Sequence, residues 1–137
     1  MQVFARIRVL RPLTILWVIY GLVWIVLEGA MWSVVLMAVL TTAVSILTFL
    51  QKRLSGKALS RGKFVGVTAV SGFIFGLGSA LLTLLFMAVK TGLHAHGPEF
   101  SQAEIEWIIR QIPLWSTSGF LLGLGTGLVI AGVDNTE

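Results

Sequence analysis

The chain has no cysteine and few charged residues. Without cysteine, disulfides, thiolate metal sites and cysteine nucleophiles are all excluded. Charged residues make up 12% of its 137 residues, against about 25% in soluble domains. Asp134 is the only aspartate. Chemistry that depends on ionisable side chains therefore has few residues to draw on.

Apolar residues are abundant instead. They make up 56% of the chain, and the mean hydropathy is +0.93. A chain of this length cannot hide so much apolar surface in one core, so we expect lipid to be the solvent for much of it. The basic pI of about 10.1 comes from two clusters beside apolar runs, which favours lipid headgroups over nucleic acid. We predict an all-α polytopic membrane protein, with residues 1–137 as a single transmembrane domain.

Four apolar runs predict four crossings. Between Leu13 and Leu50 only Glu28 is charged, and one helix over this stretch would be roughly 57 Å long, almost twice the bilayer core. We therefore expect a hairpin whose turn holds Glu28 and Gly29, with Glu28 at the interface. If Glu28 instead lies inside the bundle, it is a candidate proton or cation site. The predicted crossings are 11–28, 31–50, 64–90 and 114–133.

The basic, apolar N-terminus also resembles a signal peptide. Its apolar run is long and contains Trp17, Tyr20 and Trp24, and no small-x-small cleavage site follows it. We therefore predict that it is retained as the first crossing. Packing or lipid contact is the favoured role of the three aromatic residues, which share one helix face; a cofactor platform is the alternative.

The connection over residues 51–63 is basic. It holds no acid, and we expect its five basic residues to contact lipid headgroups: Lys52, Arg53, Lys57, Arg61 and Lys63. Four crossings place this loop and both termini on one side. With Arg6, Arg8 and Arg11, that side carries eight of the ten basic residues. The positive-inside rule then predicts an inner-membrane protein with both termini in the cytoplasm.

Residues 91–113 form the predicted outer loop, which begins at the expected helix terminator Gly92. Within it, about 101–112 reads as a short interfacial amphipathic helix. Ser101 and Glu104 have capping-box spacing, and Glu106 and Arg110 are spaced for an i,i+4 pair. Four isoleucines form one apolar stripe: Ile105, Ile108, Ile109 and Ile112. Pro113 favours a bend before the last crossing; the alternative is an N-terminal extension of that helix.

Two similar sequence segments each contain a row of small residues. Residues 71–82 (SGFIFGLGSALL) and 118–129 (SGFLLGLGTGLV) match at seven of twelve positions. Small residues four apart allow helix backbones to approach closely in lipid. We therefore predict helix packing, within the chain or between copies, through Gly72, Gly76, Ala80, Gly119, Gly123 and Gly127.

The segment KTGLHAHGPEF, residues 90–100, contains both histidines. His94 and His96 are weak metal candidates, with Glu99 as an oxygen ligand, but spacing supplies too few ligands to predict a metal. Asp134 should lie across the membrane from both histidines, so no Ser–His–Asp triad is expected. The glycines of GLGSA (76–80) and GLGTG (123–127) lie inside apolar runs, so no phosphate-binding loop is expected either. We assign no catalytic or cofactor-binding residue.

The favoured function is a non-enzymatic structural or accessory subunit. It would associate through the glycine-rich faces with a membrane-protein partner or with copies of itself, within the lipid bilayer and without nucleic acid. The first alternative is a small oligomeric channel or transporter. The second is a membrane enzyme or metal-handling protein that uses the loop of His94 and His96.

Overall fold

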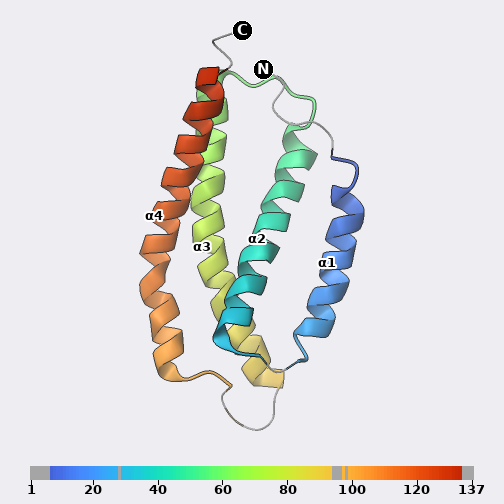
Figure 1. Cartoon of the computed structure of the whole chain (residues 1–137), viewed down its shortest axis with the longest axis vertical. Coiled ribbons are helices and arrows are strands. Elements are labelled where there is room, and N and C mark those ends of the chain that lie inside the picture. The colour runs from blue at the N-terminus through green and yellow to red at the C-terminus, as the bar shows by residue number, and fades with distance from the viewer. Residues whose placement is uncertain (1–6, 28, 94–96, 98, 134–137) are drawn as a thin grey trace.

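The computed structural model describes residues 7–27, 29–93, 97 and 99–133, and this part of the chain is all-helical (Figure 1). The predicted fold class is confirmed. The four helices are α1 (Leu10–Trp24), α2 (Met31–Leu54), α3 (Arg61–Leu93) and α4 (Gln102–Val133).

Three helices, α2, α3 and α4, are long and apolar enough to cross a membrane. Helix α1 is also apolar but has only 15 residues. At 1.5 Å per residue it is about 22 Å long, shorter than the roughly 30 Å hydrocarbon core. The first predicted segment, 11–28, thus extends beyond the observed helix: the N–H of Ile25 still bonds to the Gly21 carbonyl, after which the chain turns.

The helices run up and down, so that their ends gather at two ends of the bundle (Figure 1). Helices α1 and α3 begin, and α2 and α4 end, at what we call the basic end. It carries Arg8 and Arg11 beside the start of α1, together with Lys52, Arg53, Lys57, Arg61 and Lys63 between α2 and α3. The other end, called the distal end, carries Lys90, Glu99, Glu104, Glu106 and Arg110.

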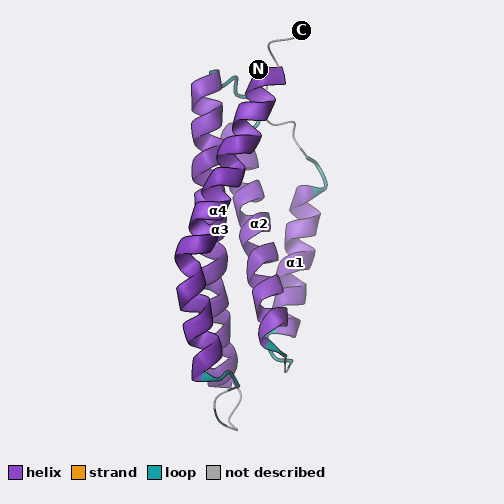
Figure 2. Cartoon of the chain, turned by 60° about the vertical axis from the view of Figure 1, so that its left-hand side comes forward, coloured by secondary structure: helices purple, strands orange, loops and turns teal. Residues whose placement is uncertain are grey.

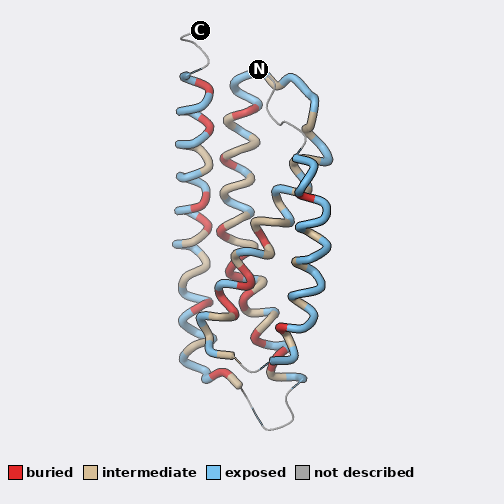
Figure 3. Tube along the Cα trace, turned by 45° about the vertical axis from the view of Figure 1, so that its right-hand side comes forward, coloured by how far each residue is buried: buried red, intermediate tan, exposed pale blue. Residues whose placement is uncertain are grey.

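Packing is uneven across the bundle. Helices α3 and α4 lie against each other along their lengths, whereas α1 stands at the edge beside α2 (Figures 1 and 2). Most of α1 is exposed, and its buried residues are Leu10 and Trp24 (Figure 3). The main cluster of buried apolar residues lies toward the distal end: Trp24, Val34, Val35, Met37, Met87, Phe100 and Ile108.

Helix α4 corrects the expected break at Pro113. Residues 102–112 are helical, as predicted, but they continue into the last apolar segment as one helix with Pro113 inside it. Proline removes one backbone donor, yet such residues are tolerated in membrane helices where neighbouring groups compensate. Ile108 accounts for the continuous helix, because it is fully buried in the distal cluster and holds this part of α4 against the bundle.

The predicted start of that helix is confirmed. The Ser101 N–H donates to Glu104 Oε2 at 2.8 Å, and the Glu104 N–H donates to Ser101 Oγ at 3.3 Å, which is a capping box. The i,i+4 pair is also present: Arg110 Nη2 and Glu106 Oε2 are 3.7 Å apart. Both side chains of this pair are exposed, so its contribution to stability is small.

The α2–α3 and α3–α4 connections are shorter than predicted. Helix α2 continues to Leu54 and α3 already begins at Arg61, so residues 55–60 join them instead of 51–63. Gly56 has a φ of +76°, which suits glycine in a tight connection. At the distal end α3 runs through Gly92 to Leu93, so Gly92 does not end the helix as expected.

Candidate functional site

A lysine is fully buried at the distal end of the bundle. Lys90 lies in the last turn of α3, and its side chain has no exposed area. The ammonium group lies 4.5 Å from the centroid of the Trp24 ring and donates a hydrogen bond to the Leu27 carbonyl oxygen. A cation over an aromatic face is attracted by the ring quadrupole. Lys90 therefore joins the end of α3 to the end of α1.

Glu99 brings a third segment to the same place. Its Oε1 lies 4.0 Å from Lys90 Nζ and accepts a hydrogen bond of 3.1 Å from the Gly29 N–H, while its side chain is 14% exposed. The neighbouring Phe100 is buried in the distal cluster, which fixes the segment beside α3. We call Trp24, Leu27, Gly29, Lys90 and Glu99 the distal lysine cluster.

The chemistry of this cluster is that of a cross-link between segments. Removing a charge from water is costly, and a buried pair offsets that cost only with additional hydrogen bonds. Here the ammonium group contacts a carbonyl oxygen, an aromatic face and a carboxylate, and the carboxylate also accepts a backbone N–H. The cluster thus fastens the α1–α2 turn to α3 and to the start of α4.

The predicted metal candidates are only partly placed. His94, His96 and the possible intramembrane acid Glu28 lie outside the described residues. Glu99 is placed, and its Oε1 faces Lys90 and the Gly29 N–H. Within the described ranges, no group of three or more His, Cys, Asp or Glu side chains is arranged to hold a metal ion.

The glycine rows lie where α3 and α4 touch. A Cβ added to Gly72 would meet the Gly119 carbonyl oxygen, and one added to Gly119 would meet that of Gly72. Gly76 faces the Trp115 carbonyl in the same way, and Gly123 faces that of Thr68. Gly127 on α4 lies against Val65 and Thr68 of α3, and Ala80 on α3 is fully buried. The two rows thus face each other within one chain.

Several hydroxyl side chains within the helices donate to a carbonyl of the preceding helical turn. Thr42 Oγ1 donates to Ala38 O at 2.8 Å, Thr83 Oγ1 to Ser79 O at 2.7 Å, and Ser116 Oγ to Ile112 O at 2.7 Å. Such i−4 bonds satisfy a hydroxyl in an apolar setting. These hydroxyls are therefore unsuited to line a polar path through the bundle.

The three aromatic residues of α1 have different environments. Trp17 Nε1 donates to Thr41 Oγ1 on α2 at 3.1 Å, and Thr14 and Thr48 pair their hydroxyls at 3.2 Å. Trp24 is buried against Phe86 and Lys90, whereas Tyr20 is 54% exposed. Trp17 and Trp24 therefore dock α1 onto the bundle, in line with the favoured packing role.

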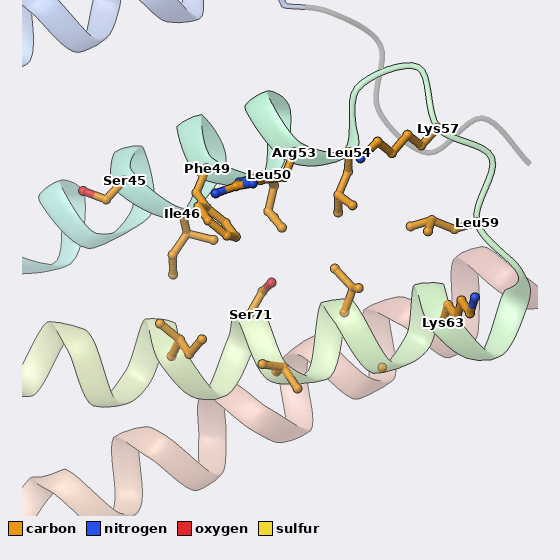
Figure 4. A pocket seen from close by; sticks show the side chains of 14 residues that line it. Ser45, Ile46, Phe49, Leu50, Arg53, Leu54, Lys57, Leu59, Lys63 and Ser71 are labelled. Carbon is orange, nitrogen blue, oxygen red and sulfur yellow. The ribbon is translucent and has the colours of Figure 1, made fainter.

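An apolar groove opens between α2 and α3 toward the basic end (Figure 4). We call it the α2–α3 groove; its volume is about 1020 Å³. Its walls are Ser45, Ile46, Phe49, Leu50, Arg53, Leu54, Lys57, Leu59, Lys63, Gly66, Val67, Val70, Ser71 and Ile74. A Cβ added to Gly66 would have no neighbour within 4 Å, so the α3 wall leaves open space there.

Charge is confined to one end of this groove. Arg53 lies beside Phe49, with its guanidinium carbon 5.9 Å from the ring centroid, while Lys57 and Lys63 lie toward the connecting segment (Figure 4). No acid is among the lining residues. Of the five predicted headgroup contacts, the structure brings these three to the groove. Lys52 and Arg61 are exposed at the same end without lining it.

Comparisons of the chain with protein-family models, with curated proteins and with solved structures give no match. The function must therefore be argued from the residues themselves.

Sequence reasoning missed the distal lysine cluster and the α2–α3 groove. The sequence pattern presents Glu99 only as a weak metal ligand. The sequence signal available for the cluster was one cation and one anion flanking the same short connection between α3 and α4. No sequence pattern indicated the groove, because its existence depends on the spacing between α2 and α3.

Proposed function

We propose that this chain is a small integral membrane protein that acts as a non-enzymatic accessory subunit. The observation that carries the proposal is the division of the bundle into a tightly packed α3–α4 pair and a lightly packed α1. The glycine rows are occupied within the chain, so a partner would bind through other faces than those rows.

The α3–α4 pair would be the scaffold. In lipid, close packing of small residues replaces the hydrophobic force that joins helices in water. Facing rows of Gly72 and Gly76 against Gly119 and Gly123 give a backbone-to-backbone contact of this kind, a glycine zipper. Such a contact supports a rigid pair that holds the rest of the chain.

Helix α1 would be the partner-binding element. Its contact with α2 depends on Trp17, Thr14 and a few apolar residues, and it is anchored at the distal end by Trp24. Its outward face is apolar, with Leu16 63%, Leu22 67% and Val23 61% exposed. As a helix of about 22 Å it also falls short of the bilayer core, a mismatch that association with other helices relieves.

The membrane placement follows from the charge distribution. The basic end would face the cytoplasm of an inner membrane, with α1 crossing so that both termini lie on that side. The described residues at the distal end are mixed in charge, with Lys90 and Arg110 against Glu99, Glu104 and Glu106.

Native mass spectrometry of the full chain in mild detergent tests this proposal. We expect a complex, either with another membrane protein or with copies of the chain, that is lost in Leu16→Ser/Leu22→Ser. Leu121→Ser/Leu128→Ser on the exposed side of α4 is the matched control and should keep the complex. A monomer under all mild conditions, or equal loss in both variants, contradicts the proposal. Ion or solute flux in liposomes would instead support the channel or transporter alternative.

A further inference from the structure

We propose that the α2–α3 groove binds one anionic glycerophospholipid, with an acyl chain between the helices and its phosphate at Arg53, Lys57 and Lys63. The inference rests on the membrane placement in the proposed function, but not on the protein partner. It goes beyond general headgroup contact, because it assigns a defined site to three of the basic residues.

The shape and lining of the groove fit an acyl chain. Its inner walls are aliphatic or aromatic, with Ile46, Phe49 and Leu50 from α2 facing Val67 and Ile74 from α3. Its volume of about 1020 Å³ is at the upper end of ligand-site volumes. Gly66 widens the groove near its basic end, where no side chain fills the space.

The charges fit a phosphate at one end only. Three cations without an acid among the lining residues favour an anion. A transmembrane helix from a second copy would match the apolar walls but would leave these cations without a counter-ion. An apolar tail joined to a negative headgroup matches both parts of the groove, because the basic side chains lie at the end where headgroups would lie (Figure 4).

Arg53 and Ser71 add polar groups to the groove wall. The Arg53 guanidinium lies over Phe49, so its charge is held beside the apolar wall. Arginine presents a planar fork that matches phosphate geometry. The Ser71 hydroxyl points into the gap between the helices (Figure 4), where it can donate to an ester carbonyl.

The binding site of the headgroup is tested with two double variants, each of which removes two positive charges from the basic end of the bundle. The full chain in mixed micelles containing phosphatidylglycerol and phosphatidylcholine is examined by native mass spectrometry. We expect one phosphatidylglycerol bound in preference to phosphatidylcholine. Arg53→Gln/Lys63→Gln should weaken that binding by about 25-fold, since each basic residue near a membrane surface contributes about fivefold. Lys52→Gln/Arg61→Gln also removes one arginine and one lysine, and it should retain the lipid.

The acyl chain is tested by filling the groove. Gly66→Phe and Val70→Phe place a ring in it, and each should reduce bound phosphatidylglycerol at least fivefold with the helical circular dichroism unchanged. Gly125→Phe is the control, because Gly125 is also an exposed helical glycine with open space around its Cα. Two filling variants ensure that a folding defect in one does not decide the result.

Three results would overturn the proposal. Equal loss of bound phosphatidylglycerol in both charge variants would show that the basic end attracts the lipid through a diffuse positive field. Undiminished lipid binding in both filling variants would place the acyl chain outside the α2–α3 groove. A lipid-free dimer that the filling variants dissociate would make a second copy the occupant. Alkaline carbonate extraction distinguishes failure of the lipid site from failure of the proposed membrane placement. If the placement holds, the protein stays in the membrane pellet in every variant.

Discussion

Lys90 Nζ and Glu99 Oε1 lie 4.0 Å apart at the distal end of the bundle, with the Gly29 N–H donating to the same carboxylate oxygen. The pair thus connects the end of α3, the segment before α4 and the α1–α2 turn. Removal of one charge from a buried pair takes away part of what offsets the cost of burying the other charge. The pair should therefore matter much more for stability than an exposed pair of the same type.

Glu99→Gln should lower the free energy of unfolding by about 1.5–3 kcal/mol, because it removes a carboxylate charge from beside the fully buried Lys90 ammonium and from the Gly29 N–H. Lys90→Met should also destabilise, and the double variant should lose less than the sum of the two. Thermal and denaturant unfolding in detergent measure this cycle. Glu106→Gln, in the exposed pair with Arg110, is the control and should cost less than about 1 kcal/mol. Strict additivity would show that the pair is not coupled.

Glycine substitutions should distinguish the α3–α4 contact from the exposed surface of α4. Gly76→Ala and Gly119→Ala each add a Cβ against a backbone carbonyl, and such overpacking costs about 1–3 kcal/mol. Gly125→Ala adds the same atom in open space, and the better helix propensity should leave stability unchanged or raised by up to about 1 kcal/mol. Melting temperatures in one detergent compare the three. Equal melting temperatures would show that the rows do not pack as described.

Substitution of the buried Ile108 tests whether the first part of α4 packs in the bundle. Ile108→Ala should destabilise by about 2–5 kcal/mol, because Ile108 is fully buried among Trp24, Met87 and Phe100. Ile109→Ala removes the same atoms from a residue that is 50% exposed, and it should have a much smaller effect. A helix lying across the interface would instead give similar, small losses for the two variants in unfolding experiments.

Gly97, in the described part of the distal connection between α3 and α4, is a position that favours glycine. Gly97 has a φ of +110°, a conformation that side-chain-bearing residues rarely adopt, so Gly97→Ala should cost about 1–3 kcal/mol. Gly92 lies inside α3 with open space around it, and Gly92→Ala should be neutral or slightly stabilising. Unfolding in detergent compares the two. A smaller loss for Gly97→Ala than for Gly92→Ala would contradict the assigned backbone.

Local sequence patterns were sufficient to predict much of the fold. The all-helical class followed from the apolar runs, and the capping box at Ser101 and Glu104 followed from spacing alone, because its bonds join residues three apart. The continuity of α4 through Pro113 did not follow in the same way. It depends on the tertiary burial of Ile108, which a local rule for proline does not include.

The candidate sites were less predictable, since they join distant parts of the chain. The Gly29–Glu99 hydrogen bond links the first hairpin to the segment before the last helix, and no periodicity reports such a contact. Similarly, the repeated phrases indicated helix packing but left open whether the rows meet within one chain or between copies. Only the relative placement of α3 and α4 brings Gly72 to Gly119.

Cysteine labelling in intact cells tests the membrane arrangement most directly, because the chain has no cysteine of its own. Val9→Cys and Ser60→Cys, both exposed at the basic end, should react with a membrane-impermeant maleimide only after permeabilisation. Gln102→Cys at the distal end should react in intact cells. Labelling of Val9→Cys from outside would contradict the crossing of α1, and labelling of Ser60→Cys from outside or protection of Gln102→Cys would contradict the orientation of the whole bundle.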